Sequence, residues 1–193
     1  MASAGLWAGL NSAAAVSGGP STGVRGVNAQ RLMNARAEPG NWMTHGGNYD
    51  EQRFADLSQI TAGNVNKLGL AWSVDLDTSR GQEATPIVVD GTMFTTTAWS
   101  KVMALDAATG RVKWKFDPQV DKARGQSACC DVVNRGVAVW NGLVFVAALD
   151  GRLIALDAGT GKVKWSSQTF TDTPLPYTIT GAPRVVKGRV VIG

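Results

Sequence analysis

The chain has 193 residues, of which 44% are hydrophobic and 18% charged, an ordinary balance for one globular domain with a sizeable core. Its net charge is +4, but the lysines and arginines are scattered, so the charge favours a solvated surface and argues against a nucleic-acid interface. No apolar stretch approaches the roughly 20 residues that a transmembrane helix needs, which argues against a membrane span.

We interpret residues 1–36 as a remnant secretory leader or a poorly ordered arm. This part of the chain contains the run AGLWAGLNSAAAV, which is similar to the apolar section of a leader. A leader normally begins with basic residues, but residues 1–23 contain neither Lys nor Arg. We therefore place the folded unit at residues 37–193.

The next segments predict one helix followed by strands. Residues 57–68, LSQITAGNVNKL, predict a short helix with Ser58 or Thr61 as its cap. Residues 86–97, PIVVDGTMFTTT, contain two β-rich runs around Asp90-Gly91, which is a strong hairpin signal. The runs KVMALDA and RVKWKFD then flank a turn, and together these runs predict four antiparallel strands.

The same unit is then repeated. Residues 104–114 read ALDAATGRVKW and residues 155–165 read ALDAGTGKVKW, at an offset of 51. The second unit has the strand-like runs GVAVW, LVFVAAL, LIALDA and KVKWSS, and a third copy begins at 182–183. Periods of this length mark propellers or solenoids, and four antiparallel strands per unit are typical of a propeller blade. The predicted fold is all-β, an incomplete β-propeller of about three four-stranded antiparallel blades.

The repeat also predicts roles for its own residues. Asp106 and its repeat partner Asp157 can accept hydrogen bonds from backbone amides of the following turn. The glycines of those turns suit a positive φ. Trp114 and Trp165 occupy equivalent places, with Trp72 as a third member, and we expect them to pack between blades.

Cys129 and Cys130 are the only cysteines, and they are adjacent. A disulfide between neighbours would close almost no loop and so would contribute little stability. The count alone favours two reduced, buried thiols. Metal binding is disfavoured because the chain has no other cysteine and only one histidine, His45. We expect His45 to bond within the N-terminal segment, without a catalytic role.

The surroundings of the cysteines resemble a known family. The run SACCDVVNRG (127–136), together with NWMTHGGNYDEQRF (41–54), GLAWSVDLDTSRGQEATP (69–86) and YTITGAP (177–183), is similar to motifs of the alcohol dehydrogenases that depend on pyrroloquinoline quinone (PQQ). All occur in the family's order, over residues 37–193. The resemblance implies an N-terminal part of an eight-bladed quinoprotein propeller, and it is strongest toward the quinohaemoprotein branch.

The resemblance implies five residues that bind the cofactor. Cys129 and Cys130 match a vicinal disulfide that lies against one face of the planar quinone. Glu83 and Thr180 match residues that contact its edge, and Arg135 matches the arginine that bonds its polar rim. PQQ is flat and carries three carboxylates, so it needs a cation and donors around its rim and covers on its faces. Taken singly, Glu83 could be a turn carboxylate, Arg135 a surface cation and Thr180 a strand residue.

The family's activity is the oxidation of primary alcohols to aldehydes in the periplasm, with electrons passed to a cytochrome c or a quinone. Its metal ion is Ca²⁺ or a lanthanide, and its metal ligands and Asp base follow the matched motifs. We therefore predict no catalytic residue and no metal ligand within this chain, and no turnover of alcohol by it in a dye-linked assay. The quinohaemoproteins also carry haem c, but this sequence contains no CxxCH.

Two alternatives to an alcohol dehydrogenase fragment remain open. A non-catalytic propeller acting as a scaffold in the bacterial envelope would share the blade repeat. It would have no reason to carry paired cysteines, RGQEATP and TITGAP together. A related quinoprotein acting on sugars is the other alternative, and the adjacent cysteines favour alcohols over it.

Overall fold

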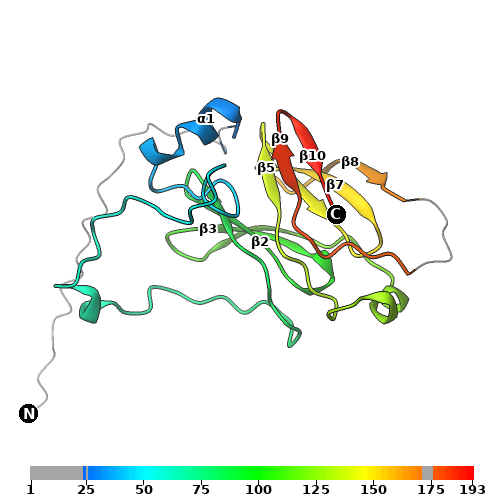
Figure 1. Cartoon of the computed structure of the whole chain (residues 1–193). Coiled ribbons are helices and arrows are strands. Elements are labelled where there is room, and N and C mark those ends of the chain that lie inside the picture. Colours follow the sequence, from blue (N-terminus) through cyan, green and yellow to red (C-terminus); the bar gives the residue numbers. More distant parts are fainter. Residues whose placement is uncertain (1–23, 25, 171–175) are drawn as a thin grey trace, which may run out of the picture.

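The computed structural model describes residues 24, 26–170 and 176–193. Its ten strands form three antiparallel sheets (Figure 1). The first sheet contains β1 (Ile87–Val89), β2 (Thr92–Thr96), β3 (Val102–Asp106) and β4 (Val112–Phe116), in chain order. The second contains β5 (Ala138–Trp140), β6 (Leu143–Ala147), β7 (Arg152–Asp157) and β8 (Val163–Gln168), also in chain order. β9 (Arg184–Val186) and β10 (Arg189–Val191) pair as a third, two-stranded sheet.

The hairpins form where the sequence predicts them. Val89 pairs with Thr92 across a two-residue turn. Asp90 and Gly91 in that turn have φ values of 48° and 72°, the left-handed conformation that tight hairpins require. The equivalent hairpins of the other two sheets turn in the same way. The predicted all-β architecture of repeated four-stranded antiparallel sheets is therefore confirmed.

The two four-stranded sheets pack face to face around the main core. Their facing sides supply large, fully buried side chains such as Phe94 and Ile87 from the first sheet and Ile154 and Leu156 from the second. The alternation of inward and outward residues along β2 produces this face, because successive side chains of a strand point to opposite sides. A smaller cluster, in which Phe145 and Val185 meet, joins the second sheet to the third.

Trp72 and Trp114 make equivalent contacts with the turn of the unit that follows each of them in the chain. Trp72 donates from Nε1 to the carbonyl oxygen of Ala107 at 3.2 Å and covers the turn at Gly110. Trp114 does the same one unit later, with Ala158 at 3.0 Å and with Gly161. The predicted packing between blades is confirmed for Trp114, which joins the first sheet to the second unit. Trp72 makes the equivalent contacts with the first sheet from a segment that contains no strand. Gly110 and Gly161 both have a φ of 71°, as their place in the repeat predicts.

The aspartates of the repeat also act as predicted. Asp106 accepts from the backbone N–H of Thr109 at 3.0 Å, and Asp157 accepts from Thr160 at the same distance. The hydroxyls of the same two threonines bond these carboxylates and lower the pKa of each aspartate. The Asp-x-x-Thr-Gly turn is thus held in one shape in both units.

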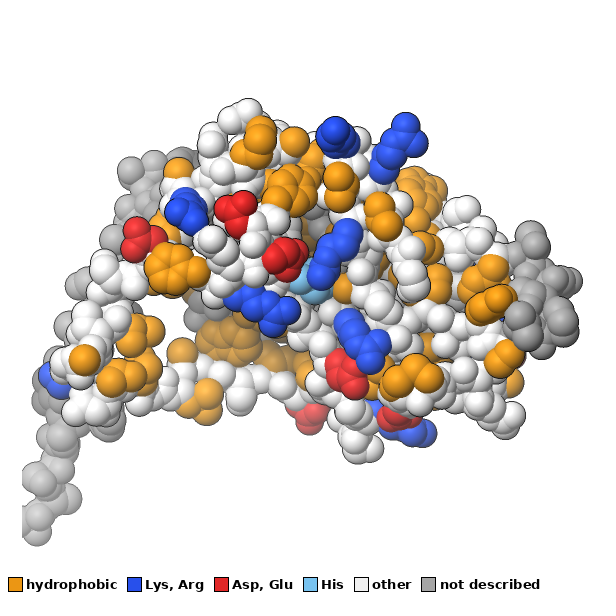
Figure 2. All heavy atoms as spheres, viewed as in Figure 1, with side chains coloured by type: hydrophobic (Ala, Val, Ile, Leu, Met, Phe, Trp, Pro, Cys, Tyr) orange, Lys and Arg blue, Asp and Glu red, His pale blue; other side chains and the backbone are white. Residues whose placement is uncertain are grey.

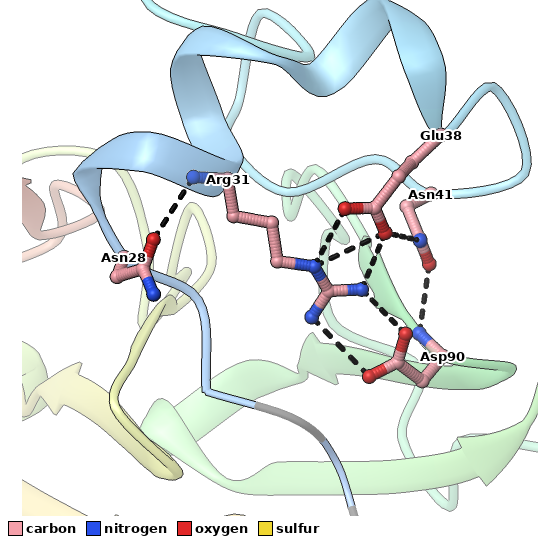
Figure 3. A network of polar contacts seen from close by, with 5 residues as sticks. All are labelled: Asn28, Arg31, Glu38, Asn41 and Asp90. Atoms are coloured by element: carbon pink, nitrogen blue, oxygen red, sulfur yellow. Dashed lines mark hydrogen bonds and ion pairs between the residues drawn. The ribbon is translucent and has the colours of Figure 1, made fainter.

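A short helix, α1 (Ala29–Met33), covers one end of the sheets and is followed by the 3₁₀ turn η1 (Ala35–Ala37). Arg31 of α1 binds Glu38 through two nitrogens, at 2.8 and 2.6 Å, and also reaches Asp90 in the first hairpin turn (Figure 3). Asn41 joins the same network, because it donates to Glu38 and accepts from the backbone N–H of Asp90. These contacts fasten the N-terminal segment to the first sheet.

This packing corrects the sequence interpretation of residues 1–36. The leader interpretation of residues 1–23 falls outside the described residues. Within residues 26–36, however, Val27 and Leu32 are almost completely buried in the main core. This stretch is therefore part of the folded body and is not a poorly ordered arm.

The predicted helix over residues 57–68 is wrong. Only the 3₁₀ turn η2 (Val65–Lys67) forms there, within a long excursion away from the sheets (Figure 1). The apolar side chains of the stretch, such as Ile60 and Leu68, are exposed, so no packed face stabilises a short helix. The side chain of Asn64 instead accepts from the backbone N–H of Thr61 at 2.7 Å, which stabilises a turn.

Candidate functional site

Two segments far apart in the sequence lie side by side and form the frame of the candidate site. One is the segment before β1, residues 80–86. The other, residues 129–136, follows the 3₁₀ turn η4 (Lys122–Ser127) and is called the cysteine loop below. Arg80 donates from Nη1 to Oδ1 of Asp131 at 2.8 Å, which ties the two segments together at one end.

Arg135 lies at the other end of the cysteine loop. It contacts two other residues that the sequence predicts for the site, Glu83 and Thr180. Its Nη2 forms an ion pair with Oε2 of Glu83 at 2.8 Å, and its Nη1 donates to the hydroxyl of Thr180 at 2.6 Å. Its backbone is held too, because its N–H donates to the Thr180 carbonyl and its carbonyl accepts from Thr85. The Arg135 side chain remains 41% exposed. It is therefore oriented by the protein yet open to a ligand.

Cys129 and Cys130 form the vicinal disulfide that the family resemblance implies, with their Cα atoms 3.8 Å apart. Both residues are exposed, which contradicts the buried thiols favoured by the cysteine count. The disulfide and Arg135 belong to one loop. The cysteine loop thus carries both an exposed disulfide and a charged group oriented by two partners.

Asn134 fixes the path of the cysteine loop. Its buried amide donates to the carbonyl of Ala147 at 2.8 Å and to the hydroxyl of Ser100 at 3.2 Å. Its amide oxygen accepts from the N–H of Gly136, and its carbonyl accepts from the hydroxyl of Thr96. Buried polar groups that are fully paired in this way specify one conformation.

Trp99 was not predicted from the sequence, yet it contacts the backbone of the cysteine loop. Its backbone N–H donates to the carbonyl of Val132 at 2.8 Å, and its ring lies against Gly125. Its φ is +65°, an uncommon value for a bulky residue, and no sequence signal marks it. The ammonium of Lys122 lies 3.8 Å from the centre of the indole ring. Trp99, Lys122, Gly125 and Val132, together with Arg80 and Asp131, line an open cavity of about 450 Å³.

His45 is buried close to Arg135. Only 8% of it is exposed, and its Nε2 has no hydrogen-bond partner. Burial, together with the positive charges of Arg184 and Arg53, lowers its pKa from 6.5 to about 4. The imidazole is therefore neutral near pH 7.

Acid should destabilise the protein through this histidine. Between pH 6.5 and about 4 the unfolded chain binds a proton that folded His45 does not, so stability falls as the pH falls through this window. A shift of this size is worth about 3 kcal/mol, and His45 contributes no pH dependence above pH 6.5. Urea denaturation at pH 7.5 and 4.5 measures the loss. The free energy of unfolding of the variant His45→Gln should fall less over the same change in pH. An equal fall in the wild type and the variant would contradict a lowered pKa for His45.

The geometry of the site can now be compared with known proteins. Residues 42–193 match the PQQ family described as the β-propeller domain of glucose, ethanol and alcohol dehydrogenases. The chain belongs to this family. The motif resemblance noted above is confirmed, and the two four-stranded sheets with the third hairpin are part of a PQQ-type propeller.

Three relatives place the chain within the PQQ dehydrogenases. The quinohemoprotein alcohol dehydrogenase ADH-IIG of Pseudomonas putida is 60% identical over 167 residues, which are 86% of this chain and 23% of that protein. Its solved structure superimposes with a TM-score of 0.86 at 59% identity, over 88% of this chain and 25% of its own. The 1-butanol dehydrogenase (cytochrome c) of Thauera butanivorans is 58% identical over 81% of this chain and 23% of its own.

A europium-containing methanol dehydrogenase is also similar, with a TM-score of 0.78 and 42% identity over 85% of this chain and 29% of its own. The chain thus spans about a quarter of the length of the curated relatives it matches. The relatives named above are alcohol dehydrogenases, and one of them contains europium.

The described part of the chain contains neither a cluster of metal ligands nor a membrane-spanning helix. No group of three or more His, Cys, Asp or Glu residues there could hold a metal ion. Within the same residues, no helix is long and apolar enough to cross a bilayer.

Proposed function

We propose that this chain supplies one wall of the PQQ site of an alcohol dehydrogenase that oxidises primary alcohols to aldehydes. The observation that carries the proposal is the placement of Arg135, which is held between Glu83 and Thr180 on the same loop as the Cys129–Cys130 disulfide. Three separate segments converge on one partly exposed arginine side chain. A structural ion pair alone would not require an exposed disulfide on the same loop.

The residues present fit the cofactor. The exposed part of the Arg135 guanidinium has nitrogen donors to offer to a carboxylate of PQQ, and the Thr180 hydroxyl adds a polar group beside it. Glu83 neutralises part of the arginine charge and aligns it, and in the proposal its carboxylate also contacts the cofactor edge. The disulfide supplies a flat cover for one face of the ring. When bound, PQQ supplies the two-electron acceptor for alcohol oxidation.

The remaining parts of the proposal concern the whole protein. We place the metal ligands, for Ca²⁺ or a lanthanide, and the catalytic base outside the described residues. The relatives' names support haem c and a cytochrome c acceptor, with a quinone as the second candidate acceptor. The proposed compartment is the periplasm, where a disulfide persists. The three relatives are all dehydrogenases, and nothing favours the scaffold alternative.

Titration with PQQ tests the wall directly. Quenching of tryptophan fluorescence should saturate, and PQQ trimethyl ester should bind at least about tenfold more weakly, because esterification removes the charges that Arg135 recognises. Reduction of the disulfide should also weaken PQQ binding. Equal affinity for PQQ and its ester, or no saturable binding at all, would overturn the proposal.

A further inference from the structure

The position of His45 is fixed by the segment that carries it. Trp42 pairs with Val88 of β1 through two backbone hydrogen bonds of 2.8 and 2.9 Å. The indole of Trp42 then donates to the carbonyl of His45 at 3.3 Å. The imidazole lines a small cavity, and Figure 2 shows histidine, in pale blue, only as a small patch between neighbouring side chains. It is thus held against the first sheet and not on a loose loop.

The imidazole packs directly against the residue that follows Arg135. A Cβ atom added to Gly136 would lie 3.2 Å from Nε2 of His45 and 3.0 Å from the carbonyl oxygen of Thr85. Gly136 also has a φ of +123°, which other residues rarely adopt. The Arg135–Gly136 peptide therefore passes through a narrow gap between the imidazole of His45 and the backbone of Thr85.

The backbone of Arg135 is held on its other sides by hydrogen bonds. Its N–H donates to the Thr180 carbonyl at 3.0 Å, and its carbonyl accepts from the Thr85 N–H at 3.3 Å. These contacts fix the point from which the Arg135 side chain starts, and Glu83 and the Thr180 hydroxyl then hold the guanidinium. Without the imidazole, a space would open behind the peptide and the loop could retreat into it.

We propose that His45 is a positioning residue for Arg135, which aims the guanidinium at the cofactor by packing behind the Arg135–Gly136 peptide. This inference rests on the proposed function, in which Arg135 contacts PQQ. The charged groups near the imidazole are Arg184, Arg53 and Glu51, and Tyr49 lines the same small cavity. Burial and the two arginines keep the imidazole uncharged, which suits packing against a peptide.

A double-mutant cycle separates positioning from a general effect on folding. His45→Ala should raise the dissociation constant for PQQ about fivefold in the wild-type background and less than about twofold in the Arg135→Gln background, because coupled residues are not additive. His45→Gln keeps much of the side-chain volume and should recover most of the affinity. If His45→Ala does not fold, the partial truncation His45→Val takes its place in the cycle and should show a smaller loss with the same dependence on Arg135. Met43→Ala, which opens the same cavity, should lower stability without this coupling.

The outcomes are distinguishable. Equal losses in the two backgrounds, or no loss from His45→Ala, would overturn the positioning role while leaving the proposed function intact. If Arg135→Gln itself leaves PQQ affinity unchanged, the proposed function fails first.

Discussion

Replacing Trp114 by alanine is expected to lower the free energy of unfolding by about 3–5 kcal/mol, as other large buried aromatic side chains do. Only 9% of Trp114 is exposed. The substitution removes its hydrogen bond to Ala158, its cover over Gly161 and its ring contact with Phe94, whose centre lies 5.9 Å away. Because the side chain joins two sheets, the effect falls on the core that both share. Urea denaturation followed by circular dichroism measures it.

The repeat provides a matched control in Trp165. It occupies the same position one unit later, but 41% of it is exposed, and its described ring contact is with Phe145 at 5.8 Å. Trp165→Ala should therefore cost only about 1 kcal/mol in this chain, near the value of one aromatic pair. Similar losses of unfolding free energy in Trp114→Ala and Trp165→Ala would show that the contribution of Trp114 does not depend on its place between the two sheets.

Arg135→Gln is expected to raise the dissociation constant for PQQ roughly 10- to 100-fold, since hydrogen bonds to charged groups contribute about 1.5–3 kcal/mol. The substitution removes the cation that Glu83 and Thr180 hold in place. Arg135→Lys keeps the charge but loses the planar fork of donors, so its affinity should fall between those of the wild type and Arg135→Gln. Fluorescence titration at constant ionic strength provides the comparison.

The control for this substitution is Arg111→Gln. Arg111 is an exposed residue between β3 and β4, and its loss changes the net charge by the same amount. It should leave PQQ affinity within about twofold, because surface charges at a distance are largely screened by salt. A loss equal to that of Arg135→Gln would mean that PQQ is attracted by net charge alone.

Local sequence signals predicted the blades because each signal has a local cause. Asp90-Gly91 predicts a tight hairpin since both residues accept a positive φ, and the structure has that turn. In residues 57–68 the local signal failed. The predicted helix does not form, because its apolar side chains have no surface of the protein to pack against. The contribution of Val27 and Leu32 to the core was also missed, because these two residues follow the leader-like run of residues 4–16 and no repeated apolar pattern marks them.

The sequence by itself determined the repeated unit and the motifs that contain Glu83, the paired cysteines, Arg135 and Thr180. Only the tertiary structure decided that Glu83, Arg135 and Thr180 touch, because they come from three segments whose proximity depends on the packing of the sheets. It also revealed His45 and Trp99 as supports of the cysteine loop. Their roles depend on which backbone lies beside them, and a property of distant neighbours leaves no local pattern in a sequence.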